Sequence, residues 1–284
     1  MDVIVGHLAG FCGGVINSIR KSEGILNDYG SVYCLGELVH NRHAVYKLEE
    51  KGLKIIDSLN DVNSGDKVII RAHGISKDVY DIAIDKGIEL IDLTCPKVLK
   101  VHEEALKLKS DGYFIILIAK KVHPETIGTI SFCGEDSAIL ESMDEVESVV
   151  NVVEESDRNK VAVIAQTTFS VELFNKLVDE LKKNLKDYDF FVNNTICNAT
   201  ELRQKETIEI ANKVEAMVII GGKNSSNTKN LYELAIKNCS NCFIIEEVSE
   251  LNCDLSNFPS VGVMAGASTP QDIIDEVVLY LKRL

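Results

Sequence analysis

The chain has 284 residues, of which 45% are hydrophobic, with 8 cysteines and a formal net charge of -14. This is the composition of a globular protein, and no apolar run approaches the roughly 18 residues that a membrane span needs. Nucleic acids are bound mostly through Lys and Arg, so the acidic charge argues against them as partners. The first residues show no basic segment followed by an apolar stretch, and we expect a cytoplasmic protein that does not enter a membrane.

Short runs rich in Val and Ile alternate with helical patterns along the chain, which is typical of parallel βαβ units. Ten runs are predicted strands, at residues 3–7, 32–35, 66–71, 88–93, 113–119, 160–166, 188–193, 216–221, 242–246 and 260–265. Helices are predicted at residues 14–28, 41–51, 77–87, 97–110, 171–186, 199–214, 228–238 and 270–283. Pro96, Pro124 and Pro270 fall at expected first helical turns, where the missing N–H costs nothing.

A unit of three residues is written three times along the chain. It consists of a cysteine, a polar or imidazole residue 28 positions later, and a third polar residue beyond it. The three units are Cys12-His40-His73, Cys95-His123-Thr167 and Cys197-Ser225-Ser268. Each of these residues follows a predicted strand and precedes a helical pattern. Ligands bind at the carboxyl ends of parallel strands, where helix N-termini present free N–H groups, so these positions predict a binding site.

The repeated unit favours three small domains over its alternative, one continuous doubly wound sheet of ten strands. No Gly/Ser linker or low-complexity stretch separates the thirds, so we expect them to pack around a shared centre. The predicted domains are residues 13–95, 96–192 and 193–284, with the segment 1–12 packing near the centre. The predicted fold class is α/β, with three pseudo-threefold-related domains of mainly parallel sheets.

The repeated cysteines lack the paired short spacings of a structural zinc site, which uses four ligands. A cubane iron–sulfur cluster normally takes four cysteines, so a set of three leaves one iron open to an external ligand. Cys95 stands at an expected helix N-terminus before Pro96, where the helix dipole stabilises a thiolate. Cys34 and Cys133 lie in apolar surroundings and are expected to be buried packing residues.

A second group of cysteines has the short spacing that the first group lacks. Cys239, Cys242 and Cys253 could form a zinc or redox motif. Packing is the interpretation that we favour, because no fourth Cys or His lies near them and Cys242 begins an apolar run. The sequence assigns these three cysteines no role.

Hydroxyl, amide and imidazole side chains at the starts of expected helices form a second constellation. Side chains of this kind cap free N–H groups, and the same geometry binds phosphate. The candidates are His40, His73, Ser225, Asn227 and Ser268. For each one alone, ordinary capping or a structural role is the alternative.

Glu125 falls in the first turn of a helix that Pro124 opens, two residues after His123. Beside a bound anion and a reducing cluster, its carboxyl group is a candidate to hold or pass a proton. The hydroxyl of Thr167 could relay that proton or orient a substrate alcohol. A partner for the helix dipole is the alternative role for Glu125.

Nine short motifs resemble, in order, those of the family of 4-hydroxy-3-methylbut-2-enyl diphosphate reductases, the last enzymes of the methylerythritol phosphate route to isoprenoids. They are residues 10–15, 39–42, 72–74, 92–96, 123–125, 166–168, 195–200, 223–227 and 265–268. The resemblance covers nearly the whole chain. One departure is the pair Lys120 and Lys121, which stands where we would expect a glycine-rich approach to His123.

The resemblance implies three α/β domains around a central [4Fe-4S] cluster, with one open iron and Cys12, Cys95 and Cys197 as its ligands. The residues implied to bind the substrate diphosphate are His40, His73, Ser225, Ser226, Asn227 and Ser268, and Asn198 is implied to be a further substrate-binding residue. The resemblance also implies that His123, Glu125 and Thr167 face the allylic hydroxyl group, and that Glu125 is central to its protonation.

The implied reaction is reductive dehydroxylation of (E)-4-hydroxy-3-methylbut-2-enyl diphosphate to isopentenyl and dimethylallyl diphosphate. It uses two electrons, with the substrate hydroxyl at the open iron and Glu125 in proton delivery. Flavodoxin or ferredoxin is the implied electron donor, and we expect a monomer. Two other classes stay open from the residues alone: a [4Fe-4S] hydro-lyase, which needs no external electrons, and a non-enzymatic metal-binding or redox-sensing module.

Overall fold

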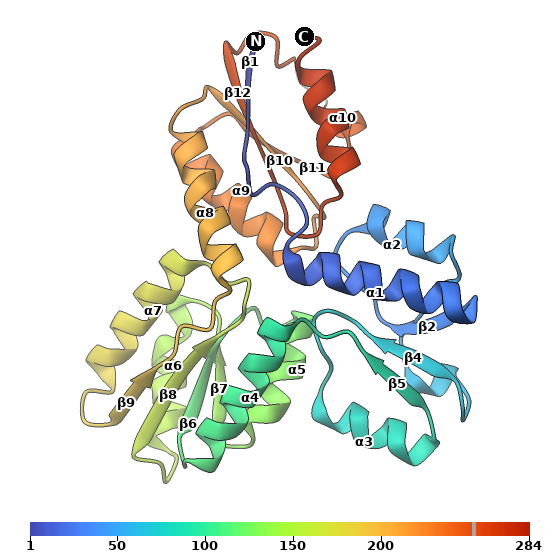
Figure 1. The fold of residues 1–284 in the computed structure, drawn as a ribbon. Helices are drawn as coiled ribbons and strands as arrows, with labels where there is room; N and C mark the ends of the chain where they lie inside the picture. Colours follow the sequence, from blue (N-terminus) through green and yellow to red (C-terminus); the bar gives the residue numbers. More distant parts are fainter. Residues whose placement is uncertain (252–253) are drawn as a thin grey trace. The chain divides into compact units, whose positions relative to one another are not determined.

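A computed structural model describes residues 1–251 and 254–284. These residues form three four-stranded sheets whose neighbouring strands all run parallel (Figure 1). The chain divides into two compact units. Unit 1 comprises Met1–Glu23, Val39–Gly52 and Asn198–Leu284, and unit 2 comprises Gly24–Leu38 and Leu53–Cys197. Each unit is described by itself.

The three sheets share one strand order. Sheet B runs β3 (Leu53–Ile56), β2 (Val32–Leu35), β4 (Lys67–Ile70), β5 (Glu89–Asp92). Sheet C runs β7 (Ser137–Leu140), β6 (Phe114–Ile118), β8 (Lys160–Ala165), β9 (Asp189–Val192). Sheet A runs β11 (Cys242–Ile245), β10 (Ala216–Ile220), β12 (Ser260–Ala265), β1 (Asp2–Val5). The predicted α/β class with three parallel sheets is confirmed, and a single ten-stranded sheet is excluded.

The N-terminal strand β1 completes the third sheet. It pairs with β12 in the register Asp2 to Ser260 and takes the place that β5 and β9 hold in the other sheets. The third repeat therefore borrows its last strand from the start of the chain. The predicted domain boundaries stay a prediction.

Ten helices occur in the described part of the chain. They are α1 (Gly13–Tyr29), α2 (Arg42–Glu49), α3 (Lys77–Lys86), α4 (Pro96–Ser110), α5 (Pro124–Cys133), α6 (Val146–Glu154), α7 (Val171–Asn184), α8 (Asn198–Ala211), α9 (Ser226–Asn238) and α10 (Gln271–Leu281). Helix α6 and strands β3 and β7 were not predicted, and for α5 only the opening turn at Pro124 was predicted. None of the helices in these described ranges has the length and apolarity to cross a membrane.

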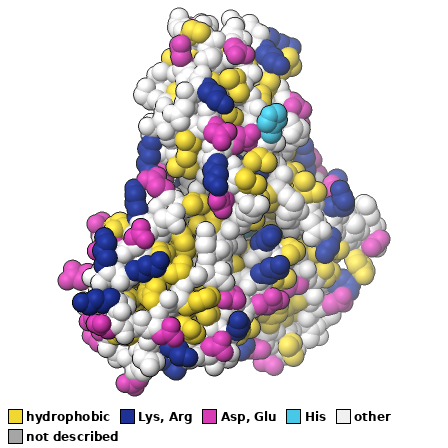
Figure 2. Space-filling view, turned by 60° about the vertical axis from the view of Figure 1, so that its left-hand side comes forward, with side chains coloured by type: hydrophobic (Ala, Val, Ile, Leu, Met, Phe, Trp, Pro, Cys, Tyr) yellow, Lys and Arg dark blue, Asp and Glu magenta, His cyan; other side chains and the backbone are white. Residues whose placement is uncertain are grey.

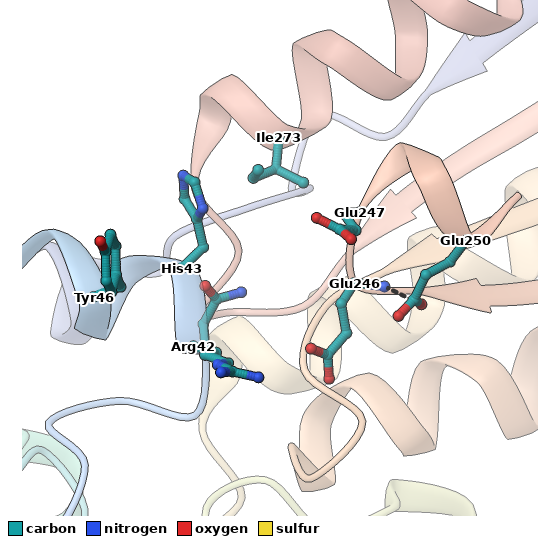
Figure 3. A pocket seen from close by; sticks show the side chains of 8 residues that line it. Arg42, His43, Tyr46, Glu246, Glu247, Glu250 and Ile273 are labelled. Carbon is teal, nitrogen blue, oxygen red and sulfur yellow. Dashed lines mark hydrogen bonds between the residues drawn. The ribbon is translucent and has the colours of Figure 1, made fainter.

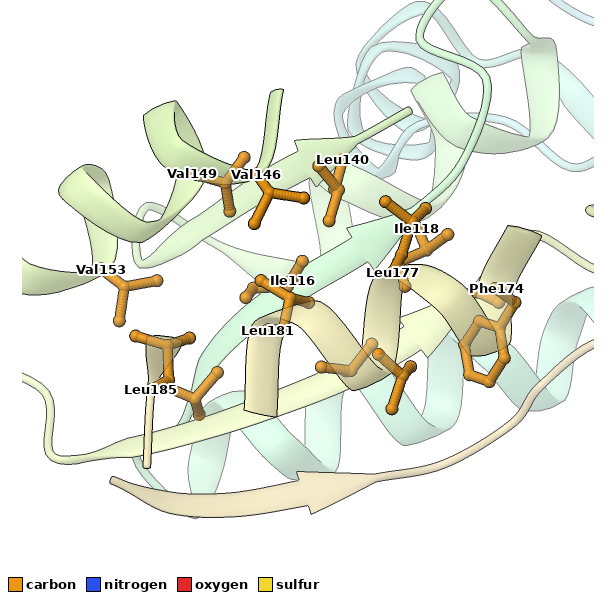
Figure 4. Close-up of a cluster of buried hydrophobic side chains, with 14 of the residues drawn as sticks. Ile116, Ile118, Leu140, Val146, Val149, Val153, Phe174, Leu177, Leu181 and Leu185 are labelled. Carbon is orange, nitrogen blue, oxygen red and sulfur yellow. The ribbon is translucent and has the colours of Figure 1, made fainter. Parts of the chain in front are cut away.

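Sheet C is covered on both faces, and its strands alternate accordingly. Phe114, Ile116 and Ile118 of β6 pack against α6 and α7 (Figure 4). The residues between them, Ile115 and Leu117, pack against α4 and α5. All five are at most 2% exposed, and burial of each such side chain contributes about 1.5–3 kcal/mol. This core fixes the carboxyl edge of sheet C.

Sheet A is built in the same way. One face packs against Ile274 and Val277 of α10, and the other against Ile210 of α8 and Leu231 of α9.

On the face of the molecule drawn in Figure 2, basic side chains are interspersed with acidic ones and do not gather in one patch.

Candidate active site

Among the residues that the structure describes, nine of the twelve strands lead through a short turn that carries a predicted site residue into a helix. Strands β1, β2 and β4 lead to Cys12, His40 and His73, strands β5, β6 and β8 to Cys95, His123 and Thr167, and strands β9, β10 and β12 to Cys197, Ser225 and Ser268. The remaining strands β3, β7 and β11 hold the equivalent outer edge of their sheets. The expected position of these residues, after a strand and before a helix, is confirmed.

The two units contain different parts of the predicted site. Unit 1 holds Cys12, His40, Asn198, Ser225, Ser226, Asn227 and Ser268. Unit 2 holds Cys95, Cys197, His73, His123, Glu125 and Thr167. Most of the predicted anion-binding side chains thus belong to one unit, and the candidate proton-transfer side chains to the other.

The repeated cysteines differ from the other described cysteines in exposure. The half-buried ones are Cys12, Cys95 and Cys197, and the buried ones are Cys34, Cys133, Cys239 and Cys242. Burial raises the pKa of Cys34, Cys133 and Cys242 to about 12, so these thiols stay protonated at neutral pH. The predicted packing role of Cys34 and Cys133 is confirmed.

Each repeated cysteine is fixed by a backbone hydrogen bond to a neighbouring site turn. The cysteine N–H groups and their carbonyl acceptors are Cys12 to Ala267 at 3.0 Å, Cys95 to Ala72 at 2.9 Å and Cys197 to Thr167 at 2.9 Å. Every acceptor lies in, or next to, the third residue of a repeat unit. The same bond, made three times, supports the equivalence of the three cysteines.

Helix α8 holds the loop between β1 and the first repeated cysteine. Arg203, which is 3% exposed, donates from Nε to the carbonyl of Leu8 at 2.8 Å and from Nη2 to that of Gly10 at 2.9 Å. Glu206 accepts from the N–H groups of His7 and Leu8, at 2.7 and 2.9 Å. Sequence reasoning missed both side chains, because charged residues in a helix usually mark a solvated face.

In the part of the chain that the structure describes, no three His, Cys, Asp or Glu side chains are grouped closely enough to hold a metal ion. Cys12 belongs to unit 1 and the other two repeated cysteines to unit 2. Their convergence therefore stays a prediction. The donor set fits an iron–sulfur cluster in chemistry, because three accessible thiols stand at equivalent fixed turns while the other thiols that the structure describes are buried.

In unit 2, Glu125 and Thr167 form a buried polar pair. The N–H of Thr167 donates to Oε1 of Glu125 at 2.6 Å, and its hydroxyl donates to Oε2 at 2.7 Å. Glu125 is 2% exposed and Thr167 5% exposed. Burial raises the pKa of Glu125 to about 7, and the two hydrogen bonds from Thr167 oppose this rise only in part. The carboxyl group can therefore hold or release a proton near neutral pH.

The raised pKa of Glu125 makes the free energy of unfolding depend on pH. Glu125 ionises near 4.5 in the unfolded chain and near 7 in the folded one, so the folded protein binds more protons between these values. The stabilisation is complete below pH 4.5 and is lost as pH rises through 7, by about 3 kcal/mol. We expect Glu125→Gln to remove this loss, which denaturant unfolding of both proteins at pH 5 and pH 8 will measure. An equal pH dependence in both proteins would contradict it.

His123 caps the helix that carries Glu125. Its Nδ1 accepts the N–H of Glu125 at 3.1 Å, so the proton of the neutral ring lies on Nε2. The ring of His73 meets that of His123 edge to face, with centroids 5.6 Å apart. Within unit 2, these contacts join the turns after β4 and β6.

The turn of His73 rests on a buried histidine. Gly74 has a φ of 77°, and a Cβ there would lie 3.0 Å from Cε1 of His102. His102 stacks on Phe132 of α5 with ring centroids 4.3 Å apart. Burial lowers the pKa of His102 to about 4, so the ring is neutral at physiological pH. Sequence reasoning gave His102 no role, and the structure makes it a support for this turn.

In unit 1, the turns after β10 and β12 adjoin the segment that carries His40. The hydroxyl of Ser268 donates to the carbonyl of His40 at 2.9 Å. Gly222 leaves room for that same carbonyl, because a Cβ on it would lie 2.6 Å from the oxygen. Ser225 caps α9 by accepting the N–H of Thr228 at 3.3 Å. His40, Ser225 and Ser268 therefore belong to one contiguous region of unit 1.

Asn227 lies beside this region and has an amide without partners. The residue is 3% exposed, and neither Oδ1 nor Nδ2 has a hydrogen bond in the described residues. Ser226 and Asn198 are the first residues of α9 and α8, half-buried and exposed respectively. A buried amide that lacks partners costs stability, so Asn227 is suited to bind a ligand rather than to hold the fold.

We expect Asn227→Ala to weaken diphosphate binding about tenfold without lowering the melting temperature, because the folded chain loses no hydrogen bond. The matched control is Asn41→Ala. The side chain of Asn41 caps α2 by accepting the N–H of Ala44 at 3.0 Å, and its removal costs about 1 kcal/mol. Calorimetry with inorganic diphosphate and thermal unfolding will measure both quantities. A destabilised Asn227→Ala with unchanged binding would contradict the prediction.

The second group of cysteines packs in a core. Cys239 and Cys242 are buried against residues of sheet A and α9, which confirms packing for these two. Cys253 lies outside the described residues.

A pocket of about 360 Å³ in unit 1 is lined mainly by α2 and the turn after β11 (Figure 3), and no predicted site residue lines it.

The chain is similar over its whole length to proteins with an assigned activity. A family model described as LytB protein matches residues 3–282. Proteins named 4-hydroxy-3-methylbut-2-enyl diphosphate reductase from Thermoanaerobacter sp. (strain X514) and Clostridioides difficile (strain 630) are 37% and 38% identical to it. These matches cover 100% of this chain and 98% and 100% of the two relatives.

Two solved structures resemble the chain in fold. The E-1-hydroxy-2-methyl-but-2-enyl-4-diphosphate reductase from Plasmodium falciparum matches with a TM-score of 0.89 and 31% identity, over 100% of this chain and 87% of that one. A structure of (E)-4-hydroxy-3-methyl-but-2-enyl diphosphate reductase, described as the terminal enzyme of the non-mevalonate pathway, matches with a TM-score of 0.70 and 36% identity over 100% of both chains.

Proposed function

Because this chain belongs to the LytB family and is an enzyme, we propose that it catalyses the reaction for which its relatives are named. The substrate is (E)-4-hydroxy-3-methylbut-2-enyl diphosphate. Two electrons and two protons enter, and the bond between the allylic carbon and the hydroxyl oxygen breaks. The oxygen leaves as water, and a proton added to either of two carbons gives isopentenyl or dimethylallyl diphosphate.

The observation that carries this proposal is a short path from an acid to a repeated cysteine. Glu125 accepts two hydrogen bonds from Thr167, and the carbonyl of Thr167 accepts the N–H of Cys197 at 2.9 Å. The carboxyl group of Glu125, which titrates near pH 7, is thus linked through the single residue Thr167 to the candidate cluster ligand Cys197. A reductive dehydroxylation needs these two functions, a proton source and an electron source, beside the carbon–oxygen bond that breaks.

We propose that Cys12, Cys95 and Cys197 hold a [4Fe-4S] cluster. When bound, the cluster supplies the two electrons and an open iron for the substrate hydroxyl. The part of the protein itself is to keep three thiols accessible at fixed turns, as the backbone hydrogen bonds of these cysteines do.

Within this proposal the diphosphate binds at helix N-termini. Ser225, Ser226 and Asn227 lie at the start of α9, and Ser268 precedes α10. Free N–H groups and the positive end of the helix dipole favour an anion there, against the overall charge of -14. The amide of Asn227 gains the partners that it lacks in the free chain. We assign His40 and His73 to the same role, and Asn198 to substrate binding more generally.

Proton transfer is the role that we propose for unit 2. Glu125 holds its proton at neutral pH because burial disfavours the carboxylate. The Thr167 hydroxyl, which points at Oε2 of Glu125, can pass that proton or orient the substrate alcohol. His123 has its Nδ1 occupied by the N–H of Glu125, so it presents a donor from Nε2.

Flavodoxin or ferredoxin is the class of electron donor that we propose, and a cytoplasmic monomer the state in which the chain works. Both donors are usually acidic, like this chain with its net charge of -14. Steering by opposite charge is therefore absent between them, and association depends on local contacts. Turnover driven by such a donor is expected to become faster as ionic strength rises, because salt screens the repulsion.

Anaerobic turnover of the allylic diphosphate with and without a chemical reductant tests the proposal. We expect two electrons consumed for each product formed and no consumption of substrate without reductant. Consumption that needs no reductant would instead favour the hydro-lyase class. A brown protein that never consumes the substrate would contradict the proposed function and favour a redox-sensing module.

A further inference from the structure

Two of the three repeats carry the same set of hydrogen bonds next to a site turn. In sheet C, the N–H of Lys121 donates to Oε2 of Glu141 at 2.8 Å, and its Nζ donates to Oε1 of Glu145 at 2.5 Å. The N–H of Glu141 donates in turn to Oε2 of Glu145 at 3.0 Å. We call these three residues clasp C. It ties the turn after β6 to the turn after β7.

Sheet A repeats this arrangement with different residues. The N–H of Lys223 donates to Oε1 of Glu246 at 2.7 Å, and its Nζ donates to Oε1 of Glu250 at 2.9 Å. The N–H of Glu246 donates to Oε2 of Glu250 at 3.0 Å, as drawn in Figure 3. We call these residues clasp A. In both clasps the lysine is the third residue after its strand, and the glutamates are the first and fifth after the neighbouring edge strand.

In the first repeat, different residue types stand at the positions equivalent to the clasp residues. Leu38 stands in place of the lysine and is fully buried. Asp57 and Asp61 stand in place of the glutamates, and Asp61 accepts the N–H of Ser58 at 3.2 Å. An apolar side chain in the core holds this turn, where a polar clasp holds the other two.

Each clasp lies two residues before a site residue. Lys121 is followed by Val122, which is 89% exposed, and then by the buried His123. Lys223 is followed by the exposed Asn224 and then by the buried Ser225. Since the middle residue of each turn has little packing, the clasp fixes where the turn begins, and the capping bonds of His123 and Ser225 fix where it ends.

The effect of a clasp on overall stability is small, which separates it from a structural core contact. Exposed ion pairs contribute about 0–1 kcal/mol. The bond from the lysine N–H to the carboxylate is charge-assisted and directional, and so it sets the path of the backbone. In active sites, an error of about 1 Å in position can cost about a hundredfold in rate.

We propose that the clasps are positioning devices with separate effects on the reaction: clasp A sets the turn of Ser225 for diphosphate binding, and clasp C sets the turn of His123 for proton transfer. The proposal rests on the proposed function, because it uses the roles assigned there to the two turns. It also accounts for Lys121, the lysine that departs from a glycine-rich approach to His123, as the central member of clasp C.

The matched variants Glu141→Ala and Glu246→Ala, which remove the acceptor of the lysine N–H, test this division. We expect Glu246→Ala to raise KM for the allylic diphosphate about tenfold with kcat within about twofold, and Glu141→Ala to lower kcat about tenfold with KM within about twofold. Calorimetry with inorganic diphosphate gives a second readout, in which only Glu246→Ala weakens binding. Glu141→Gln and Glu246→Gln keep an acceptor oxygen and should restore most of each loss.

Lys176→Ala on α7, which removes an exposed ion pair with Glu172, is the control and should leave both constants unchanged. Thermal unfolding should shift by no more for the clasp variants than for this control. If both glutamate variants change the same kinetic constant, or neither changes any while the wild type turns over, the clasps have no separate positioning role. A wild type that neither binds diphosphate nor turns over contradicts the proposed function itself.

Discussion

Glu125→Gln is expected to lower kcat by about a hundredfold to ten-thousandfold, the usual contribution of a general acid. Glutamine has the shape of glutamic acid, and its carbonyl oxygen can still accept the N–H of Thr167, which lies 2.6 Å from Oε1 in the native protein. It carries no acidic proton. Iron content, sulfide content and KM should therefore stay within about twofold of the wild-type values while turnover collapses.

The measurement is anaerobic turnover, accompanied by iron and sulfide analysis of each sample. Glu180→Gln on α7, a half-buried glutamate paired with Lys183, is the control for amide substitution in the same unit. Retained turnover in Glu125→Gln would remove this carboxyl group from the mechanism. Lost activity together with lost iron would show a structural role instead.

The second large effect is expected from the repeated cysteines. Each of Cys12→Ser, Cys95→Ser and Cys197→Ser should lose most of its iron and sulfide, and activity should fall at least about a hundredfold. Loss of an outer-shell partner already costs up to about that factor, and loss of a ligand costs more. Cys12→Ser is the most informative of the three variants. Cys12 lies in unit 1 while the other two cysteines lie in unit 2, so this variant tests whether all three hold the same cluster.

Cys133→Ser and Cys34→Ser provide the matched controls. These thiols are buried, with pKa values raised to about 12, so serine there should lower the melting temperature but leave the iron content unchanged. Colorimetric iron and sulfide analysis of anaerobically purified protein distinguishes the outcomes. Full iron in Cys12→Ser would show that the three cysteines do not share one cluster.

The strands that precede site residues could all be predicted, while two edge strands that precede none, β3 and β7, could not. Strands β6, β8, β10 and β12 are buried on both faces and give apolar runs that periodicity detects. Strands β3 and β7 have four residues each, and polar residues interrupt or begin their runs, at Lys54 and Ser137. The equally short edge strand β11 was predicted because its apolar run, Cys242–Ile245, is unbroken. No predicted site residue follows β3 or β7, so no motif marked them either.

Helix α6 was missed, and helix α5 was predicted only at its first turn, each for a different reason. Helix α6 carries valines at 146, 149, 150 and 153, a helical period, but β-branched residues favour strands and obscured the pattern. Helix α5 has a weak amphipathic pattern, because buried residues such as Thr126, Gly128 and Thr129 lie among its apolar ones. A helix enclosed in this way lacks the polar face by which such segments are detected.

Within the candidate site, spacing found the residues at strand ends but not those that hold them. Arg203 and His102 act through contacts with residues far away in sequence, at Leu8 and Gly74. Such contacts depend on the tertiary fold and leave no local pattern. The clasps could be predicted in part. Their glutamates recur at matched positions after β7 and β11, and this regularity becomes visible once those edge strands are known.

The pairing of β1 with β12 sets the order in which the protein can be assembled. Residues 2–5 are synthesised long before their partners at residues 260–263. Contacts so distant along the chain form late and slowly, after more local elements have folded. Arg203 and Glu206, which hold the loop before Cys12, are also made long after it. A nascent chain therefore lacks a settled place for its first repeated thiol until α8 and β12 have been made.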